Sequence, residues 1–238
     1  MSHRADSTGE VATRTRSRIA AELGLDRDVV DNLLAAAMIR RFPRGASVYP
    51  QGTHRGTLFI VLAGTVSVSV ALANGQRILC AFYRPGAMFG FPIVEFERPR
   101  LSAADAFTDV AAAVIPRREF ERILAGLPAS VAIRFFNRLL ERQARFAMRL
   151  VHCAALDLRG RLALTLADLA STVGVPDADG VRIDLPLTHE NLAEMVGASR
   201  ERVSKGMSEL LSKRLLRYSR QAVTVVDLEG LRALAGTE

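Results

Sequence analysis

Between Phe42 and Ile115 the chain is divided into short apolar runs separated by glycine and proline, and this pattern restricts the fold more than any other feature of the sequence. Asn74-Gly75 separates two of these runs, and both residues tolerate the positive φ that a tight hairpin turn requires. Runs of strand length with turn signals between them are typical of an all-β sandwich or a rolled barrel. We therefore predict a β-domain for this part of the chain.

From Pro116 the pattern becomes helical, and residues 129–155 contain neither glycine nor proline. This stretch predicts one long helix. Apolar or small residues recur on it at heptad spacing with one polar exception: Ala132, Phe136, Leu139, Gln143, Phe146, Leu150 and Cys153. A seam this narrow favours a homodimer interface. The alternative is a helix that packs on its own β-domain.

The last third of the chain has the element order of a winged helix-turn-helix. Thr188 can cap a helix over residues 192–196, and Gly197 permits the left-handed backbone that reverses the chain. Ser199 then starts a second helix that ends near Lys213, and residues 218–226 alternate as a hairpin does.

The outer face of the second helix carries side chains that can hydrogen-bond to base edges. Arginine can bind two acceptors on guanine, glutamate can accept from cytosine, and serine can do either. The predicted base-reading residues are Arg200, Glu201, Ser204 and Lys205. The predicted contacts to the DNA backbone are Thr188, Ser199, Arg202, Ser208, Lys213, Arg214 and Arg217. The alternative for this face is a solvated surface helix.

Residues 187–193 (LTHENLA) and 197–205 (GASRERVSK) resemble the C-terminal helix-turn-helix of the Crp/Fnr superfamily of transcription regulators. Residues 56–64 (GTLFIVLAG) and 85–90 (PGAMFG) resemble its N-terminal cyclic-nucleotide-binding jelly roll. In that family the recognition helix reads the half-site through positions that correspond to Arg200, Glu201 and Lys205. Lysine at the last position lacks the two-pronged donor of the usual arginine.

The resemblance implies an α+β fold with an N-terminal jelly-roll β-domain, a long dimerisation helix and a C-terminal winged helix-turn-helix. The expected divisions are a disordered basic tail (1–18), a cyclic-nucleotide-binding-like sensor (19–127), the dimerisation helix with its hinge (128–155) and the DNA-binding domain (156–238). We expect regulation to change the angle between the two main domains through the hinge.

Ordinary recognition of cyclic AMP is not expected, because the family positions that bind its ribose and phosphate read Phe91, Leu101 and Ser102. The positions that bind haem in another branch read Gly90 and Pro92. The expected effector pocket is mainly apolar and contains Phe89, Phe91, Ile93, Leu101, Ser102 and Phe146. It is either a filled core or a site for a small apolar or aromatic effector of unknown identity.

Two cysteines, Cys80 and Cys153, are too few for a disulfide framework or an iron–sulfur cluster, and no histidine has metal-ligand spacing. We therefore predict no metal and no cofactor. No arrangement of nucleophile and base predicts an enzyme. The chain has neither a secretory signal nor an apolar run long enough to span a membrane, which favours a cytoplasmic protein without membrane contact.

The net charge of +7 favours a polyanionic partner, and the predicted partners are double-stranded DNA, a second copy of the chain and RNA polymerase. Five arginines form a further stripe on the long helix: Arg134, Arg138, Arg142, Arg145 and Arg149. This stripe is either a solvated face or a site for a cyclic dinucleotide or RNA polymerase. A sensor or scaffold that does not bind DNA remains an alternative function for the whole chain.

Overall fold

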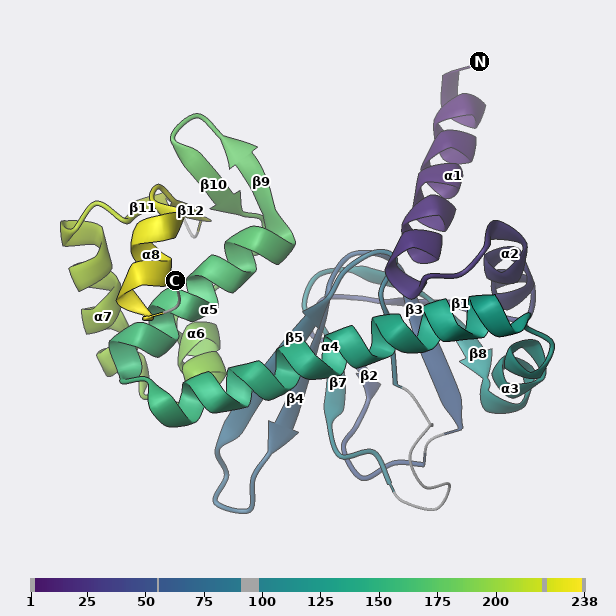
Figure 1. Cartoon of the computed structure of the whole chain (residues 1–238), viewed down its shortest axis with the longest axis horizontal. Helices are drawn as coiled ribbons and strands as arrows, with labels where there is room; N and C mark the ends of the chain where they lie inside the picture. Colours follow the sequence, from purple (N-terminus) through teal and green to yellow (C-terminus); the bar gives the residue numbers. More distant parts are fainter. Residues whose placement is uncertain (1–2, 55, 91–98, 220–221, 237–238) are drawn as a thin grey trace. The chain divides into compact units, whose positions relative to one another are not determined.

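The computed structural model describes residues 3–54, 56–90, 99–219 and 222–236. The chain forms two compact units, Met1–Ala144 and Arg145–Glu238, and the long helix α4 (Ala129–Ala155) contributes to both (Figure 1). Within the described ranges, no helix combines the length and the apolar character needed to cross a bilayer.

The first unit contains two four-stranded antiparallel sheets, with strand orders β1-β8-β3-β6 and β2-β7-β4-β5. The strands are β1 (Met38–Phe42), β2 (Ser47–Tyr49), β3 (Thr57–Ala63), β4 (Val66–Ala71), β5 (Arg77–Tyr83), β6 (Met88–Phe89), β7 (Ala103–Ala106) and β8 (Val110–Pro116). The predicted hairpin at Asn74-Gly75 is confirmed, because Ala71 pairs with Arg77 across it and Gly75 has a φ of 82°. The N-terminal β-sandwich therefore has the predicted architecture.

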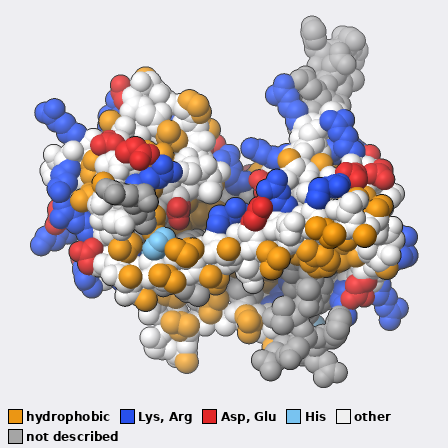
Figure 2. Space-filling model, in the orientation of Figure 1, with side chains coloured by type: hydrophobic (Ala, Val, Ile, Leu, Met, Phe, Trp, Pro, Cys, Tyr) orange, Lys and Arg blue, Asp and Glu red, His pale blue; other side chains and the backbone are white. Residues whose placement is uncertain are grey.

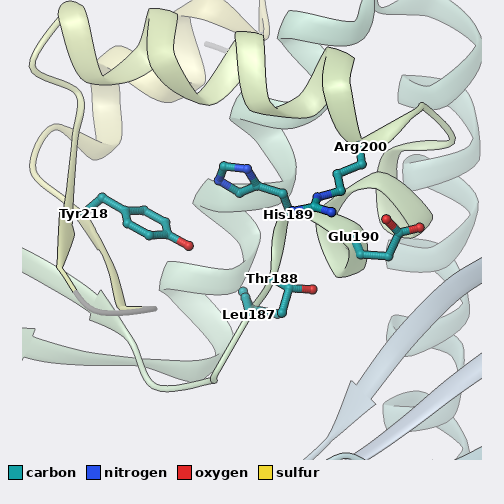
Figure 3. A pocket seen from close by; sticks show the side chains of 6 residues that line it. All are labelled: Leu187, Thr188, His189, Glu190, Arg200 and Tyr218. Atoms are coloured by element: carbon teal, nitrogen blue, oxygen red, sulfur yellow. The ribbon is translucent and has the colours of Figure 1, made fainter.

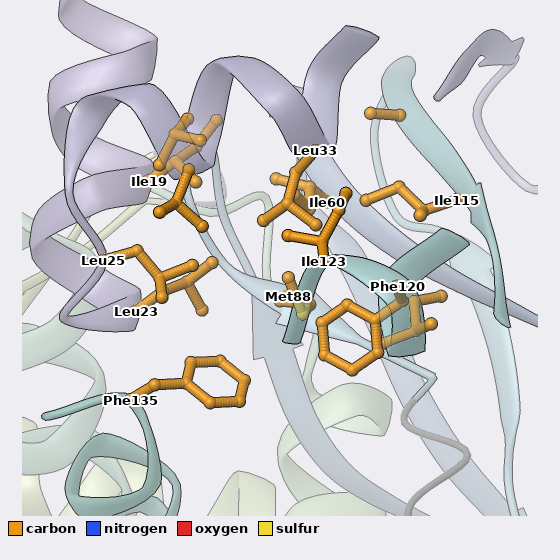
Figure 4. Packing of buried hydrophobic residues seen from close by; sticks show 14 of the residues in the cluster. Ile19, Leu23, Leu25, Leu33, Ile60, Met88, Ile115, Phe120, Ile123 and Phe135 are labelled. Carbon is orange, nitrogen blue, oxygen red and sulfur yellow. The ribbon is translucent and has the colours of Figure 1, made fainter. Parts of the chain in front are cut away.

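Apolar side chains from both sheets form the core between them, with Phe59 and Phe89 stacked at a centroid distance of 5.1 Å. The outer face of the sheet that contains β3 and β8 is covered by helices α1 (His3–Leu23), α2 (Arg27–Ala35), α3 (Arg117–Ala125) and α4. Figure 4 shows the second core that results, where Leu33, Ile60 and Phe120 are buried. Burial of side chains of this size is the main favourable contribution to folding.

The expectation of a disordered tail over residues 1–18 is corrected by α1. Its C-terminal part places Ile19 and Leu23 in the helix-covered core, where they are 0% and 4% exposed. Arg16 also forms an ion pair of 2.8 Å with Asp31 on α2. Packing of Ile19 and Leu23 stabilises the C-terminal end of α1, and the polar turns that precede these residues extend the same helix toward the N-terminus.

Helix α4 has two apolar faces, which the heptad reading merged into one seam. Val131 and Phe135 are buried against the β-domain, and Leu139 packs on the same core, so Leu139 does not belong to an exposed seam. An exposed set lies on the opposite face and is called here the α4 stripe: Ile133, Phe136, Leu140, Ala147 and Val151. Spacings of 3, 4, 7 and 4 keep these residues on one side of a helix with 3.6 residues per turn.

The second unit contains the C-terminal helices and a four-stranded antiparallel sheet of order β11-β12-β10-β9. Its elements are α5 (Leu158–Val173), β9 (Gly174–Asp177), β10 (Gly180–Ile183), α6 (His189–Val196), α7 (Arg200–Ser212), β11 (Leu216–Ser219), β12 (Ala222–Val225) and α8 (Leu228–Leu234). Asp157 caps α5 by accepting a hydrogen bond of 2.8 Å from the Gly160 N–H, so the break after α4 is fixed locally. The hairpin predicted over residues 218–226 corresponds to β11 and β12.

Candidate nucleic-acid interface

The ends of α6 and the start of α7 are fixed by four short polar or small residues. The Thr188 hydroxyl accepts from the Asn191 N–H at 3.1 Å, and the Asn191 side-chain oxygen accepts from the Thr188 N–H at 3.1 Å, which forms a capping box. Gly197 ends α6 in the left-handed conformation, with φ 66° and ψ 49°. Ser199 then caps α7 by accepting from the Arg202 N–H at 3.4 Å. The helix-turn-helix predicted from the sequence is therefore confirmed in its local geometry.

The inward face of this motif is fully apolar. Val203, Met207 and Leu210 on α7 are at most 1% exposed, and Leu192 and Val196 on α6 are buried opposite them. These five residues recur at helical spacing and form the core that the two helices share. Because the buried face fixes the rotation of α7 about its axis, the opposite side chains are held toward solvent.

Arg200, Glu201, Arg202 and Lys205 all lie exposed on the outward face. Figure 2 shows Lys and Arg side chains gathered over the region of α7. Hydrogen bonds from its own backbone N–H and from the Ser199 hydroxyl hold the pKa of Glu201 below its usual value. Glu201 is thus an ionised acceptor at neutral pH, and Arg200 beside it is a cationic donor.

Ser204 has a different environment from the other predicted base-reading residues. It is half-buried, and its Oγ lies 2.8 Å from Nδ1 of His189 on α6. His189 in turn contacts Tyr218 of β11 edge-on, with ring centroids 5.8 Å apart. An open hollow of about 450 Å³ lies beside this pair, lined by Leu187, Thr188, His189, Glu190, Arg200 and Tyr218 (Figure 3). The sequence predicts only an ordinary surface or capping role for His189, because its partner Ser204 is fifteen residues away along the chain.

The residues predicted to contact the DNA backbone fall into two groups. Thr188, Ser199, Arg202, Ser208, Lys213 and Arg214 are exposed on or beside α6 and α7. Arg217 is also exposed, but its guanidinium forms ion pairs with Asp179 and, at 3.9 Å, with Asp177. Its charge is therefore balanced within the hairpin region, which makes Arg217 a weaker candidate than the sequence indicates.

Asp177 joins strands that are distant in sequence. It accepts from the Ala178 N–H at 2.9 Å and from the buried Thr224 hydroxyl at 3.1 Å. These two bonds, with Arg217 nearby, lower the pKa of the Asp177 carboxyl. The carboxylate thereby links the β9–β10 turn to β12 and to the Arg217 side chain of β11.

The expected apolar effector pocket is wrong in its chemistry. The β-domain has a cavity of about 200 Å³ lined by Tyr49, Val68, Tyr83, Phe89, Gly90, Arg100, Leu101, Ser102 and Arg142. Phe89, Leu101 and Ser102 of the expected pocket line this cavity, although Leu101 is 70% exposed. Phe146 belongs to the second unit, and Phe91 and Ile93 lie outside the described residues.

Two arginines make this cavity polar. Arg100 is 5% exposed, donates to the carbonyl oxygens of Thr57 and Gly90 at 2.7 and 3.2 Å, and stacks 3.9 Å from the Tyr49 ring centroid. Arg142 donates to the Met88 carbonyl at 2.7 Å. Burial raises the pKa of Tyr49 despite the opposing charge of Arg100, so its hydroxyl is neutral at physiological pH. Arg100 could not be predicted from the sequence, because its partners come from separate segments of the chain.

The arginine stripe on α4 is largely used for contacts within the chain. Arg134 forms an ion pair of 2.6 Å with Asp26, Arg138 pairs with Glu141 at 3.0 Å, and Arg142 bonds the Met88 carbonyl. Arg145 is exposed, while the side chain of Arg149 lies outside the description, as does that of Cys153. The stripe thus gives no support to a separate cyclic-dinucleotide site. Among the described residues, no cluster of histidine, cysteine or acidic side chains is arranged to bind a metal ion.

Two sequence profiles match this chain, the cyclic nucleotide-binding domain over residues 39–126 and the Crp-like helix-turn-helix domain over residues 160–234. The chain belongs to the Crp/Fnr family of transcription regulators. The CRP-like cAMP-activated global transcriptional regulator of Mycobacterium tuberculosis is 29% identical over 217 residues, which cover 90% of this chain and 96% of that protein. The global nitrogen regulator of Synechococcus elongatus is 28% identical over 191 residues, which cover 79% of this chain and 86% of that protein.

Solved structures of Crp/Fnr regulators have the same fold. A CRP-family transcriptional regulator from Thermus thermophilus superposes with a TM-score of 0.68 at 27% identity, covering 83% of this chain and 97% of its own. FixK2 from Bradyrhizobium japonicum gives a TM-score of 0.72 at 20% identity over 83% and 96% of the two chains, which bears on the fold alone. The Crp/Fnr chain described here is a DNA-binding transcription regulator and not an enzyme, as the sequence predicted.

Proposed function

We propose that this Crp/Fnr regulator binds an inverted-repeat operator as a homodimer and reads each half-site with Arg200, Glu201 and Lys205. The observation that carries the proposal is the division of α7 into a buried apolar face and an exposed charged face. An arginine, an ionised glutamate and a lysine within the first two turns match the donor and acceptor pattern of a major groove. The exposed cations Arg202, Lys213 and Arg214 add salt-dependent attraction to phosphates.

The α4 stripe supports the homodimer. It exposes Ile133, Phe136 and Leu140 at 60%, 48% and 65%, and Val151 at 54%, along one side of a 27-residue helix. Figure 2 shows hydrophobic side chains along the surface of the long helix. Pairing of two such stripes about a two-fold axis would cover the apolar surface on both copies. Two recognition helices held about 34 Å apart then fit successive major grooves.

Gating by cyclic AMP in the usual mode is not part of the proposal. Leu101 provides no charge for a cyclic phosphate, and the nearby Arg100 guanidinium is bonded to backbone carbonyls and stacked on Tyr49. The Mycobacterium tuberculosis relative is named as a cAMP-activated regulator, so the difference can be tested directly. We include RNA polymerase as the further partner through which a DNA-bound regulator acts on transcription.

Selection of bound DNA from a random pool, with and without cyclic AMP, tests this function. We expect an enriched inverted repeat with half-sites about one helical turn apart, and the same motif and affinity in both arms. Failure to enrich any motif would overturn the DNA-binding proposal. A motif that appears only with cyclic AMP would overturn the part that concerns the effector.

A further inference from the structure

We propose that His189 is a specificity-determining positioning residue, which acts on base recognition through the hydroxyl of Ser204. This inference rests on the proposed function, because it assigns a role within the same recognition surface. Its basis is one hydrogen bond between the two helices of the motif, from Nδ1 of His189 to Oγ of Ser204 at 2.8 Å.

Helix α6 and strand β11 hold the imidazole in place. His189 is the first residue of α6, next to the Thr188 cap, and its ring edge meets Tyr218 of β11 at a tilt of 65°. Figure 3 shows the ring between Tyr218 and Arg200, beneath the start of α7. His189 is itself only partly exposed. The ring orientation is therefore determined by α6 and the β11 strand, independently of any DNA.

The bond changes what the Ser204 hydroxyl can offer to a base. A hydroxyl has one proton to donate and two lone pairs that accept. When Nδ1 accepts a hydrogen bond from the Ser204 hydroxyl, Ser204 can only accept from DNA. When Nδ1 donates, one lone pair of Ser204 is occupied and its O–H proton points away from His189. In either tautomer the hydroxyl is limited to a smaller set of partners than a freely rotating one, and this limitation is the source of selectivity.

Other hydroxyls in the same unit indicate which hydrogen bond Ser204 would form without His189. Ser208 donates to the carbonyl four residues earlier at 3.0 Å, and Ser171 and Thr172 on α5 do the same at 2.9 and 2.7 Å. Such back-bonding is the usual local choice of a helical serine or threonine. Ser204 is bonded to His189 across the motif, so its hydroxyl is held apart from this local role.

The test is a double-mutant cycle on base preference. His189→Phe keeps a ring against Tyr218 but removes the nitrogen, and Ser204→Ala removes the hydroxyl. Each protein is measured as the full chain against operators that carry every base at each position of the selected half-site. We expect each single variant to lose roughly 3- to 10-fold of discrimination at the same base pair, with no further loss in the double variant. His189→Asn, whose amide reaches a similar position, is expected to recover most of the preference.

His54→Phe, an exposed site in the β-domain, is the matched control and is expected to keep the full preference. Thermal unfolding identifies a His189→Phe protein that has lost its fold, in which case Ser204→Ala and His189→Asn still test the inference. The inference would be overturned if His189→Phe weakened binding equally to all DNA sequences, did so also in the Ser204→Ala background, and made the salt dependence of affinity shallower. That result would show that His189 contacts a phosphate. Unchanged preference in Ser204→Ala or His189→Phe would also overturn the inference. These outcomes leave the proposed function intact. A native protein that selects no DNA motif would instead overturn both the proposed function and the inference about His189.

Discussion

At the scale of single residues, the recognition surface depends on side chains that protrude and are not needed for packing. Arg200 and Glu201 follow the Ser199 cap directly, so they occupy the first turn of α7 and are both exposed. A side chain in this position can reach a groove without strain in the helix. Energetic effects of substituting it are therefore expected in DNA binding and not in folding.

Arg200→Ala should cost about 1–3 kcal/mol of binding free energy at one base pair and relax the preference there, because a two-pronged donor is removed. Binding to operators substituted position by position measures this. Arg118→Ala, an exposed arginine on α3, serves as the control and should leave every preference unchanged. An equal loss for all operators would reassign Arg200 to a phosphate.

Asp177 makes the stability of the hairpin region dependent on acid. Its folded pKa is lowered from the usual 3.8, first by the Ala178 N–H and then by Thr224 and Arg217. Its contribution to the free energy of unfolding is thus complete above pH 3.8 and is lost as the pH falls through the lower folded pKa. Asp177→Asn should lower Tm at pH 7, and the difference from the native protein should shrink below the folded pKa.

Unfolding curves between pH 7 and pH 2 give this result directly. Asp179→Asn is the control, because Asp179 also pairs with Arg217 but lacks the bonds from Ala178 and Thr224. Comparison of the two variants therefore isolates the effect of those two bonds. A Tm difference for Asp177→Asn that stays constant across the whole range would contradict the assignment.

Residue roles that depend on distant partners could not be predicted from the sequence. Glu201 was found from its place after a helix cap, a local signal. Arg100 was not, since its bonds to Thr57 and its stacking on Tyr49 join residues 43 or more positions apart in the fold. His189 was missed for the same reason. Sequence spacing reports the period of one element, whereas these contacts depend on how separate elements pack.

At the scale of elements, local signals predicted most helices and hairpins. The absence of glycine and proline over 129–155 predicted the extent of α4, and Asn74-Gly75 predicted the β4–β5 hairpin. Helix α1 was missed because its packed residues come only at its end, around Ile19 and Leu23. Of the predicted seam on α4, the structure assigns Leu139 to the β-domain core, because two apolar faces of the helix share a similar spacing and only tertiary packing separates them.

Gly197→Ala should lower the free energy of unfolding by about 1–2 kcal/mol, since its left-handed backbone penalises a Cβ. Nothing lies within 4 Å of the added Cβ, so the cost is conformational and not steric. Because the same turn sets the α6–α7 geometry, DNA affinity should fall as well. Denaturant unfolding and operator titration measure the two effects.

Gly236→Ala is the matched control for this prediction. Gly236 has the same φ of 66° and equally open surroundings, but it follows α8 near the end of the chain. It should show a loss of stability without a loss of affinity. Equal effects on binding in the two variants would mean that strain at the turn has no special influence on the recognition helix.

At the scale of the whole molecule, the exposed α4 stripe is the feature that favours association with a second copy of the chain. A row of aliphatic and aromatic side chains is exposed on a helix whose other side is already packed on the β-domain. Lysine in place of its central leucine would put a charge into each paired surface. Assembly and operator binding are linked if two half-sites are read together.

Leu140→Lys should convert the proposed dimer to a monomer and weaken binding to the full operator by roughly 10²-fold or more, because the second half-site no longer adds to the first. Light scattering and operator titration test this pair of effects. Leu72→Lys, at a leucine 44% exposed beside the β4–β5 turn, is the control and should remain dimeric. A Leu140→Lys protein that stays dimeric would move the interface away from the stripe.

The two faces of α7 also have an evolutionary consequence. Val203, Met207 and Leu210 keep the fold, while Arg200, Glu201 and Lys205 contribute nothing to the buried core. Replacements on the outer side can therefore accumulate without threatening the stability of the protein. Descendants of such a gene can acquire new target promoters by drifting through many surface variants, each of which still folds.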